Sequence, residues 1–353
     1  MKDSPKDLID FASNDYLGFS KNNVLLDKTH RYLVEINSIK TNSIDSRFIL
    51  ENHIAKFHQT ESALIFNSAY DANLCFFSSV PQKGDLVLYD ELCHISIRDG
   101  IQHSDAKSYK FQHNDFEDLE KLIQNLRPKS QDPTAIYIVT ESVFSMDGDT
   151  PNLEELIQLS GKHKCHLVID ESHALGVFGA KGEGLVQLLG LQDQVFARIL
   201  TFNEGLGCQG AAVIGSQELK DSLTNFGLRF MGDTAHLEDL EARILVGYQH
   251  LESEKLTIEG LRENIIHFNQ QKYLLGLKPM FVQSKSAIQS AIIPGNQNLK
   301  SLASQLQDKG FDVKAILSPT VPEGQERLRF CLHSFNSNDE ISELLRLLVG
   351  LVF

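Results

Sequence analysis

The feature that most constrains the fold is the alternation of short apolar runs with helical patterns between residues 85 and 216. Five runs have the composition of buried β-strands: residues 85–91, 135–141, 166–171, 197–202 and 211–216. Helical patterns fill the intervals, as in residues 116–126 and 152–163. Strands that alternate with helices form a mainly parallel sheet covered by helices on both faces. The sequence therefore predicts an α/β fold.

The pattern changes towards the C-terminus. Residues from about 218 to 272 are mostly helical in pattern and link two domains. Beyond them we expect strands at residues 286–295, 311–316 and 327–333 and helices at residues 299–310 and 339–350. These elements predict a compact, smaller α+β domain. We divide the 353 residues into an N-terminal arm (1–45), a large domain (46–270) and a small C-terminal domain (271–353).

Composition excludes several classes of function. The net charge of −14 argues against nucleic acid and against an anionic membrane surface as partners. No apolar run approaches the ~18 residues of a membrane span, and the first residues hold no apolar signal region. The five cysteines are scattered and form no C-x-x-C pair, which favours reduced thiols over a metal site or disulfides. We expect a cytoplasmic protein without a metal.

Ligands of such sheets bind at the carboxyl ends of the strands. Four residues occupy predicted strand ends: Asp90, Glu141, Asp170 and Thr201. An acid at a strand end can pair with a cationic ring nitrogen, and the face of a histidine such as His94 can stack on an aromatic ring. His173, three residues after Asp170, can bond a phenolic oxygen. Pyridoxal phosphate (PLP) needs these groups and a lysine for its imine. Taken singly, His94 is more typical of an ordinary histidine and Asp170 of a cap or an ion pair; only the set is specific.

The motifs resemble one family over nearly the whole chain. The segments are "FASNDYLGFS", "HISIRDG", "FQHND", "SVFSMDGD", "IDESHALGVFGAKGEG" and "SPTVPEGQERLRFCLH". They are similar to those of the α-oxoamine synthases, which are fold-type I PLP acyltransferases. The resemblance implies the fold-type I PLP-transferase fold, PLP as cofactor, and a homodimer with the active site between subunits.

The resemblance also implies roles for individual residues. His94 would lie over the pyridine ring, Asp170 on its nitrogen, and Thr201 near the phosphate. His173 and Ser145 would lie near the phenolic oxygen. The remaining residues that it implies are the cofactor contacts Ala69, Tyr70 and Thr234 and the substrate contacts Asn14 and Arg47.

One departure from the family pattern concerns the catalytic residue itself. The family motif T-F-G-K supplies the imine lysine, whereas this chain has "TFNE", with Glu204 at the lysine position. A carboxylate cannot form an imine with an aldehyde. It also adds negative charge near a phosphate, and one such pair at ~4 Å and an effective dielectric of about 20 costs roughly 4 kcal/mol.

Further departures lie in other functional loops. Ala69 replaces the glycine that lets the backbone approach the phosphate, and Asp233 replaces a serine near the partner's phosphate. Leu317 and Ser318 stand where an arginine usually binds the substrate carboxylate, and "TNSIDSR" replaces a glycine-rich loop. Because PLP and an acyl-CoA are both anions, we expect weak or absent PLP binding and loss of the standard reaction.

Three hypotheses about function remain open at this point. The chain could be a non-catalytic homologue, either an inactive homodimer or the partner of a lysine-bearing paralogue. It could be a working synthase that condenses an amino acid with an acyl-CoA or acyl-carrier thioester. It could also be a small-molecule binding protein that uses the old pocket for a less anionic ligand.

Overall fold

The computed structural model describes residues 8–39, 46–127, 135–227 and 238–353, which form two compact units. The larger unit consists of Phe19–Phe144 and Thr150–Ser253. The smaller unit consists of the chain up to Gly18, the short segment Ser145–Asp149, and Glu254–Phe353. These units are defined by contacts, and our division of the chain at residues 45 and 270 stays a prediction.

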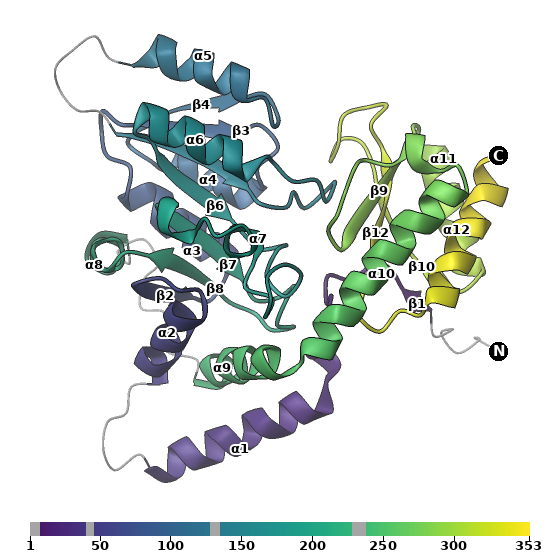
Figure 1. Ribbon diagram of the computed structural model, residues 1–353, viewed down its shortest axis with the longest axis horizontal. Coiled ribbons are helices and arrows are strands. Elements are labelled where there is room, and N and C mark those ends of the chain that lie inside the picture. Colours follow the sequence, from purple (N-terminus) through teal and green to yellow (C-terminus); the bar gives the residue numbers. More distant parts are fainter. Residues whose placement is uncertain (1–7, 40–45, 128–134, 228–237) are drawn as a thin grey trace. The chain divides into compact units, whose positions relative to one another are not determined.

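The larger unit is built on a seven-stranded sheet (Figure 1). The strand order is β2 (Ser62–Phe66), β8 (Ala211–Gly215), β7 (Ala197–Thr201), β6 (His166–Asp170), β5 (Ile136–Glu141), β3 (Leu86–Asp90) and β4 (Lys107–Phe111). Strand β8 is antiparallel to β2 and β7, and all other neighbours are parallel. The predicted α/β fold with a mostly parallel sheet is therefore confirmed.

Helices cover both faces of this sheet. One face packs against α3 (Ala69–Ser79), α4 (Ile95–Gln102) and α8 (Gln217–Phe226), and the other against α5 (Phe116–Leu126), α6 (Leu153–His163) and α7 (Leu185–Leu188). Alternate strand residues serve opposite faces: Val87 belongs to the first core, and Leu86 and Leu88 to the second. Helices α1 (Asn23–Ile39), α2 (Ser46–Phe57) and α9 (Glu238–Ser253) pack together beside β2.

Both edge strands lie outside the strands predicted from the sequence, for different reasons. All residues of β4 except Phe111 are exposed, so its sequence "KSYKF" carries no apolar run, and only pairing with β3 makes it a strand. Strand β2, "SALIF", is buried throughout. It is too short for periodicity to separate a buried strand from a piece of helix.

The smaller unit is the α+β assembly that the sequence predicts. Its antiparallel sheet has the order β11 (Lys314–Ile316), β12 (Arg327–Cys331), β9 (Ile288–Ile292), and its helices are α10 (Lys255–Leu274), α11 (Asn296–Asp308) and α12 (Asn338–Val352). The predicted strand 311–316 is divided in two, because β10 (Phe311–Asp312) pairs in parallel with β1 (Ile9–Asp10) and only β11 joins the sheet. Short 3-10 helices occur at η1 (Phe19–Lys21), η2 (Gln192–Gln194) and η4 (Lys278–Met280).

A buried ion pair joins β6 and β7 on the larger unit. Arg198 Nε and Nη2 lie 2.7 and 2.5 Å from Glu171 Oε2, and both side chains are almost fully buried. The guanidinium also donates to Gln187 Oε1 (2.9 Å) and to the carbonyl of Glu183 (3.0 Å). Glu171 Oε1 accepts from the Val186 backbone N–H at 2.9 Å. The pair therefore fixes the segment before and within α7 against two central strands.

We expect Glu171→Gln to lower the free energy of unfolding by about 3–5 kcal/mol, because it leaves the Arg198 guanidinium charged, buried and without its counter-ion. Urea denaturation followed by circular dichroism measures the change. The matched control is Lys121→Ala, which removes an exposed ion pair with Glu117 and should change stability by less than about 1 kcal/mol. Equal, small effects of the two variants would contradict the structural role of the buried pair.

Candidate functional site

The candidate site lies at the carboxyl edge of the seven-stranded sheet. Strands β3, β5, β6 and β7 end there with the buried residues Asp90, Glu141, Asp170 and Thr201. Glu141 is directly opposite Asp170 in the strand register, and Asp170 pairs with Ile199 of β7. Because neighbouring parallel strands point the same way, side chains from four separate sequence segments gather at one edge.

Asp170 is held by the turn that follows β6. Its Oδ1 accepts from the backbone N–H of Ser172 at 2.8 Å and from the Ser172 hydroxyl at 2.5 Å. Burial raises the pKa of the Asp170 carboxyl, while the bonds from Ser172 and the charge of His94 act in the opposite direction. A buried carboxylate so placed favours a cationic group beside it, such as a protonated ring nitrogen.

His94 stands at the start of α4 as its N-cap residue. Its Nδ1 accepts from the Ser96 backbone N–H and lies 2.8 Å from the Ser96 hydroxyl. The His94 backbone N–H donates to Glu141 Oε1 at 2.5 Å. The residue itself is exposed. The strand-end acid Glu141 thus anchors the backbone of His94, and the ring remains accessible to a ligand.

Glu204 lies in the tight loop that follows β7 and is only 9% exposed. Its Oε2 accepts from the Thr201 hydroxyl at 2.6 Å. Burial raises the pKa of the Glu204 carboxyl, and the negative charge of Asp170 raises it further, against the Thr201 hydrogen bond, which lowers it. Glu204 and Asp170, both selected from the sequence, are therefore close enough for their negative charges to repel each other.

The pKa of the Cys93 thiol reflects the negative charges at this edge of the sheet. Burial raises the pKa of the Cys93 thiol, and the carboxylates of Glu141, Asp90 and Asp170 raise it further. Each of these acids repels the negative charge of a thiolate. The three carboxylates thus disfavour a further negative charge at Cys93, and cationic or neutral groups are favoured beside them.

A pair that sequence reasoning did not assign completes the edge. His113 Nδ1 lies 2.9 Å from Asp90 Oδ1, and the His113 ring packs edge-on against Phe144 at 4.4 Å between centroids. The Asn114 backbone N–H donates to Asp90 Oδ2 at 2.9 Å. His113 belongs to the segment "FQHND". The pair could have been predicted from the sequence, because Asp90 ends one strand and His113 follows the next.

The other predicted residues of the larger unit are placed as follows. His173 is buried in the turn after β6. Ala69 is the first residue of α3, whose N-cap is Ser68, and the exposed Tyr70 donates its hydroxyl proton to Asp99. Arg47 binds Glu51 at 3.0 Å and the carbonyl of Ile65 at 2.8 Å, so its guanidinium serves the packing of α2 against β2.

Two predicted residues belong to the smaller unit, and one is not described. Asn14 Oδ1 accepts from Arg329 Nη1 at 3.0 Å, and the backbone carbonyl of Ser145 accepts from Arg329 Nε at 2.8 Å. The two residues thus share one buried arginine that sequence reasoning missed. Thr234, together with Asp233, lies outside the described residues.

Comparison with known proteins identifies relatives over the full length. The sequence model of the family described as aminotransferase class I and II matches residues 6–348. The 8-amino-7-oxononanoate synthase of Emericella nidulans is 35% identical over 370 residues, which cover 97% of this chain and 88% of that protein. The 8-amino-7-oxononanoate synthase 1 of Bacillus subtilis is 31% identical over 344 residues, with 96% and 86% covered.

Solved structures share the fold. The 8-amino-7-oxononanoate synthase of Francisella tularensis has a TM-score of 0.81 and 26% identity, with 97% of each chain covered. A serine palmitoyltransferase from S. paucimobilis, solved with a bound PLP–myriocin aldimine, has a TM-score of 0.88 and 24% identity, with 98% of this chain and 87% of that chain covered. The predicted fold-type I PLP-transferase fold is confirmed.

The residues of the carboxyl edge fit PLP in part. Asp170 suits a pyridinium nitrogen, the exposed His94 suits a stacked ring, and the N-terminus of α3 at Ala69 suits a phosphate. Glu204 does not fit covalent attachment, since a buried carboxyl bound to Thr201 offers no amine. We therefore derive no catalytic step through the cofactor.

We expect Glu204→Gln to stabilise the protein near neutral pH. The folded state raises the pKa of Glu204 above its ordinary value of 4.5, so the folded state binds this proton more tightly than the unfolded state does. The stabilisation from that proton is complete at low pH and is lost as pH rises through the folded pKa. The glutamine keeps an oxygen for Thr201 without the charge, so the gain should vanish in acid, below about pH 4.

Urea denaturation at several pH values measures this difference. Glu343→Gln, on the exposed side of α12, is the control and should show no such stabilisation at neutral pH. A Glu204→Gln variant that is less stable than the unchanged chain at neutral pH would show that the charged form is favoured in the fold, contrary to our interpretation.

Proposed function

Since this chain belongs to the aminotransferase class I and II family, and within it to the α-oxoamine synthases, we propose that it is an 8-amino-7-oxononanoate synthase homologue that has lost the standard reaction. The family is PLP-dependent, and its relatives here belong to the biotin pathway. In our proposal this chain acts as a non-catalytic partner subunit or is an inactive form. We place it in the cytoplasm, and none of its five cysteines forms a disulfide.

The observation that carries the proposal is the environment of Glu204. The position that would supply an amine holds a carboxyl instead, buried to 9% exposure and bonded to Thr201. The repulsion between Glu204 and Asp170 disfavours a further anion at the same edge. PLP, when bound, supplies an electron sink for a carbanion. Without an amine in place, we expect its binding to be weak and non-covalent.

The residues that remain support a binding role. Asp170 would orient a cationic or hydrogen-bonding ring atom, and the imidazole of His94 would cover the ring. The Glu141 bond to the backbone N–H of His94 holds that residue in position at 2.5 Å. This arrangement favours, as a second candidate, a small-molecule binding protein whose ligand is less anionic than PLP. A working synthase that condenses an amino acid with an acyl-CoA or acyl-carrier thioester is the alternative that the experiment below tests.

The assembly belongs to the same proposal. We propose a homodimer, or a heterodimer with a lysine-bearing paralogue. Helices α1 and α2 expose apolar side chains, among them Val24, Val34 and Ile49, which is typical of a surface that another subunit covers. Among the described residues, no helix combines the length and apolarity that crossing a bilayer requires.

We expect no covalent PLP on the unchanged chain at this site. After incubation with PLP and reduction with borohydride, mass spectrometry should find no pyridoxyl group on a lysine of the larger unit. Glu204→Lys should restore at most a weak imine and little turnover, because Ala69, Asp233 and Leu317 remain and misplacement of ~1 Å can cost about a hundredfold in rate. Turnover is measured as carbon dioxide released from alanine and an acyl-CoA.

Two variants sharpen this test. Glu204→Arg makes the same change of charge without a group that forms an imine, and should strengthen PLP binding without producing the absorbance of an imine. Adding Ala69→Gly and Asp233→Ser to Glu204→Lys should strengthen PLP binding further. Full turnover from Glu204→Lys alone would show that the other departures are neutral, and turnover by the unchanged chain would refute the proposed loss of activity.

We expect light scattering at micromolar concentration to find a dimer, whether or not PLP binds. Val34→Glu and Ile49→Glu place charges on the exposed apolar surface of α1 and α2 and should shift the protein towards monomer. Phe353→Glu at the exposed C-terminus is the control and should leave the dimer unchanged. A monomeric unchanged chain would contradict the proposed assembly.

A further inference from the structure

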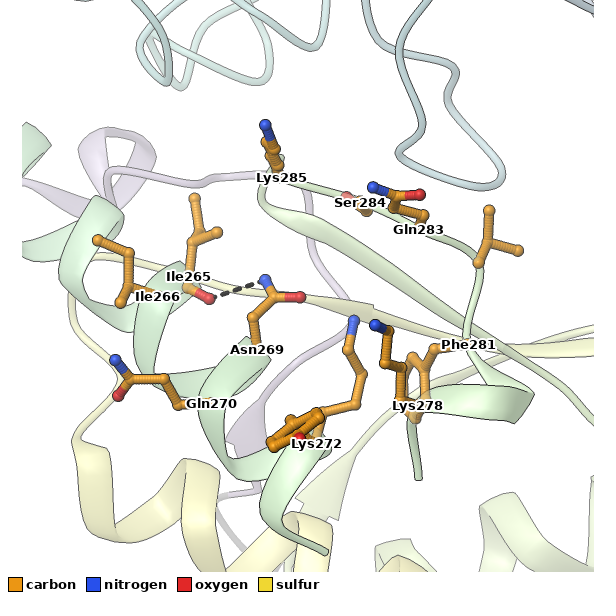
Figure 2. Close-up of a pocket in the computed structure, with 12 residues that line it drawn as sticks. Ile265, Ile266, Asn269, Gln270, Lys272, Lys278, Phe281, Gln283, Ser284 and Lys285 are labelled. Atoms are coloured by element: carbon orange, nitrogen blue, oxygen red, sulfur yellow. Dashed lines mark hydrogen bonds between the residues drawn. The ribbon is translucent and has the colours of Figure 1, made fainter. Parts of the chain in front are cut away.

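The smaller unit contains a cavity of about 590 Å³ that no part of the proposed function uses. Helix α10, η4 and the segment from Phe281 to Lys285 line it (Figure 2). Its walls are mainly apolar and include Ile265, Ile266 and Phe281. The volume is within the range of small-molecule sites, which are typically apolar with a few polar groups that fix orientation.

Two lysines of different elements meet in this cavity. Figure 2 shows the side chains of Lys272 on α10 and Lys278 on η4 among the residues that line the cavity, and the charge of Lys278 acts on Lys272. Lys272 is only 5% exposed, although lysine is rarely buried without a counter-ion. Its Nζ donates to Gln289 Oε1 at 3.0 Å and lies 5.0 Å from the centre of the Phe281 ring.

The charged residues that line the cavity favour an anionic ligand. Among its lining residues, all of them described, there are three lysines and neither an aspartate nor a glutamate. This is notable in a chain with 33 basic and 47 acidic residues. Burial and, to a smaller extent, the charge of Lys278 together lower the pKa of Lys272 to about 8. An anion between the two ammonium groups would offset their repulsion and favour the charged form of Lys272.

We propose that this cavity binds a small monocarboxylate with an apolar body. The carboxylate would lie between Lys272 and Lys278, and the apolar body would pack on Ile265, Ile266 and Phe281. The amide of Asn269 is already engaged, because its Nδ2 donates to the carbonyl of Ile265 at 2.9 Å (Figure 2). The lysine pair therefore provides the recognition of charge. The site lies wholly within the smaller unit and does not depend on the proposed function of the carboxyl edge.

Isothermal titration calorimetry of the full-length protein with hexanoate, acetate and hexanol tests the proposal. Hexanoate carries both features, acetate lacks the apolar body, and hexanol lacks the charge. We expect hexanoate to bind at least about tenfold more tightly than hexanol, as the loss of one charged hydrogen bond implies. It should exceed acetate by a similar factor, because acetate buries no apolar chain. Equal binding of hexanol and hexanoate, or no binding of hexanoate, would overturn the proposal.

Three variants locate the binding. Lys278→Met changes an exposed side chain and should weaken hexanoate about tenfold without affecting folding. Lys272→Met should weaken it at least as much. The control Lys300→Met, exposed on α11 and outside the cavity, should bind like the unchanged chain. Unchanged affinity in Lys278→Met would remove the proposed site even if Lys272→Met failed to fold.

The pH profile provides an independent readout. The titratable groups that line the cavity beside Lys272 are Tyr273, Lys278 and Lys285. Since the carboxylate binds the protonated form of Lys272, whose pKa is about 8, hexanoate affinity should fall as pH rises through that value. Lys272→Met should lose this dependence. A flat profile in the unchanged chain would contradict a role for the Lys272 charge.

Discussion

The concentration of buried acids at the carboxyl edge of the seven-stranded sheet is the constraint on which the site depends. Parallel strands that end at one edge bring Asp90, Glu141 and Asp170 together, and the loop after β7 adds Glu204. Each acid needs donors to remain buried. His113 pairs with Asp90, the backbone of His94 donates to Glu141, and Ser172 donates twice to Asp170. Glu204 relies on Thr201.

This arrangement limits which ligands the edge can hold. In a PLP enzyme a lysine forms the imine with the cofactor, and an acid pairs with the pyridinium nitrogen. Here the loop after β7 carries a carboxyl at Glu204, and burial together with the charge of Asp170 raises its pKa. The negative charges of Glu204 and Asp170 oppose each other at this edge, and this repulsion is the physical basis of the loss of function that we propose.

Among the described residues, the larger unit buries mainly acids, whereas the smaller unit buries three cations beside the acids Asp147 and Glu326. The smaller unit buries Arg327, which pairs with Asp147, and Arg329, which binds Asn14 and the carbonyl of Ser145. It also buries Lys272, whose Nζ donates to the Gln289 amide and lies over the Phe281 ring. No carboxylate is among the residues that line its cavity. The net charge of the whole chain, −14, conceals this difference, because burial and local partners decide what each group can bind.

The sequence by itself determined the central strands, since strands buried on both faces are continuous apolar runs, and the family, since its motifs extend along nearly the whole chain. It also led to the prediction that Glu204 stands where the family has its imine lysine. Only the tertiary structure decided that the exposed sequence of β4 is a strand, because pairing with β3 imposes it. Likewise, the coupling of Glu204 with Asp170 and the meeting of Lys272 with Lys278 depend on burial and on the distance between separate elements. Neither burial nor the distance between elements is a property of local sequence, so chain packing decides how the charged groups at each site interact.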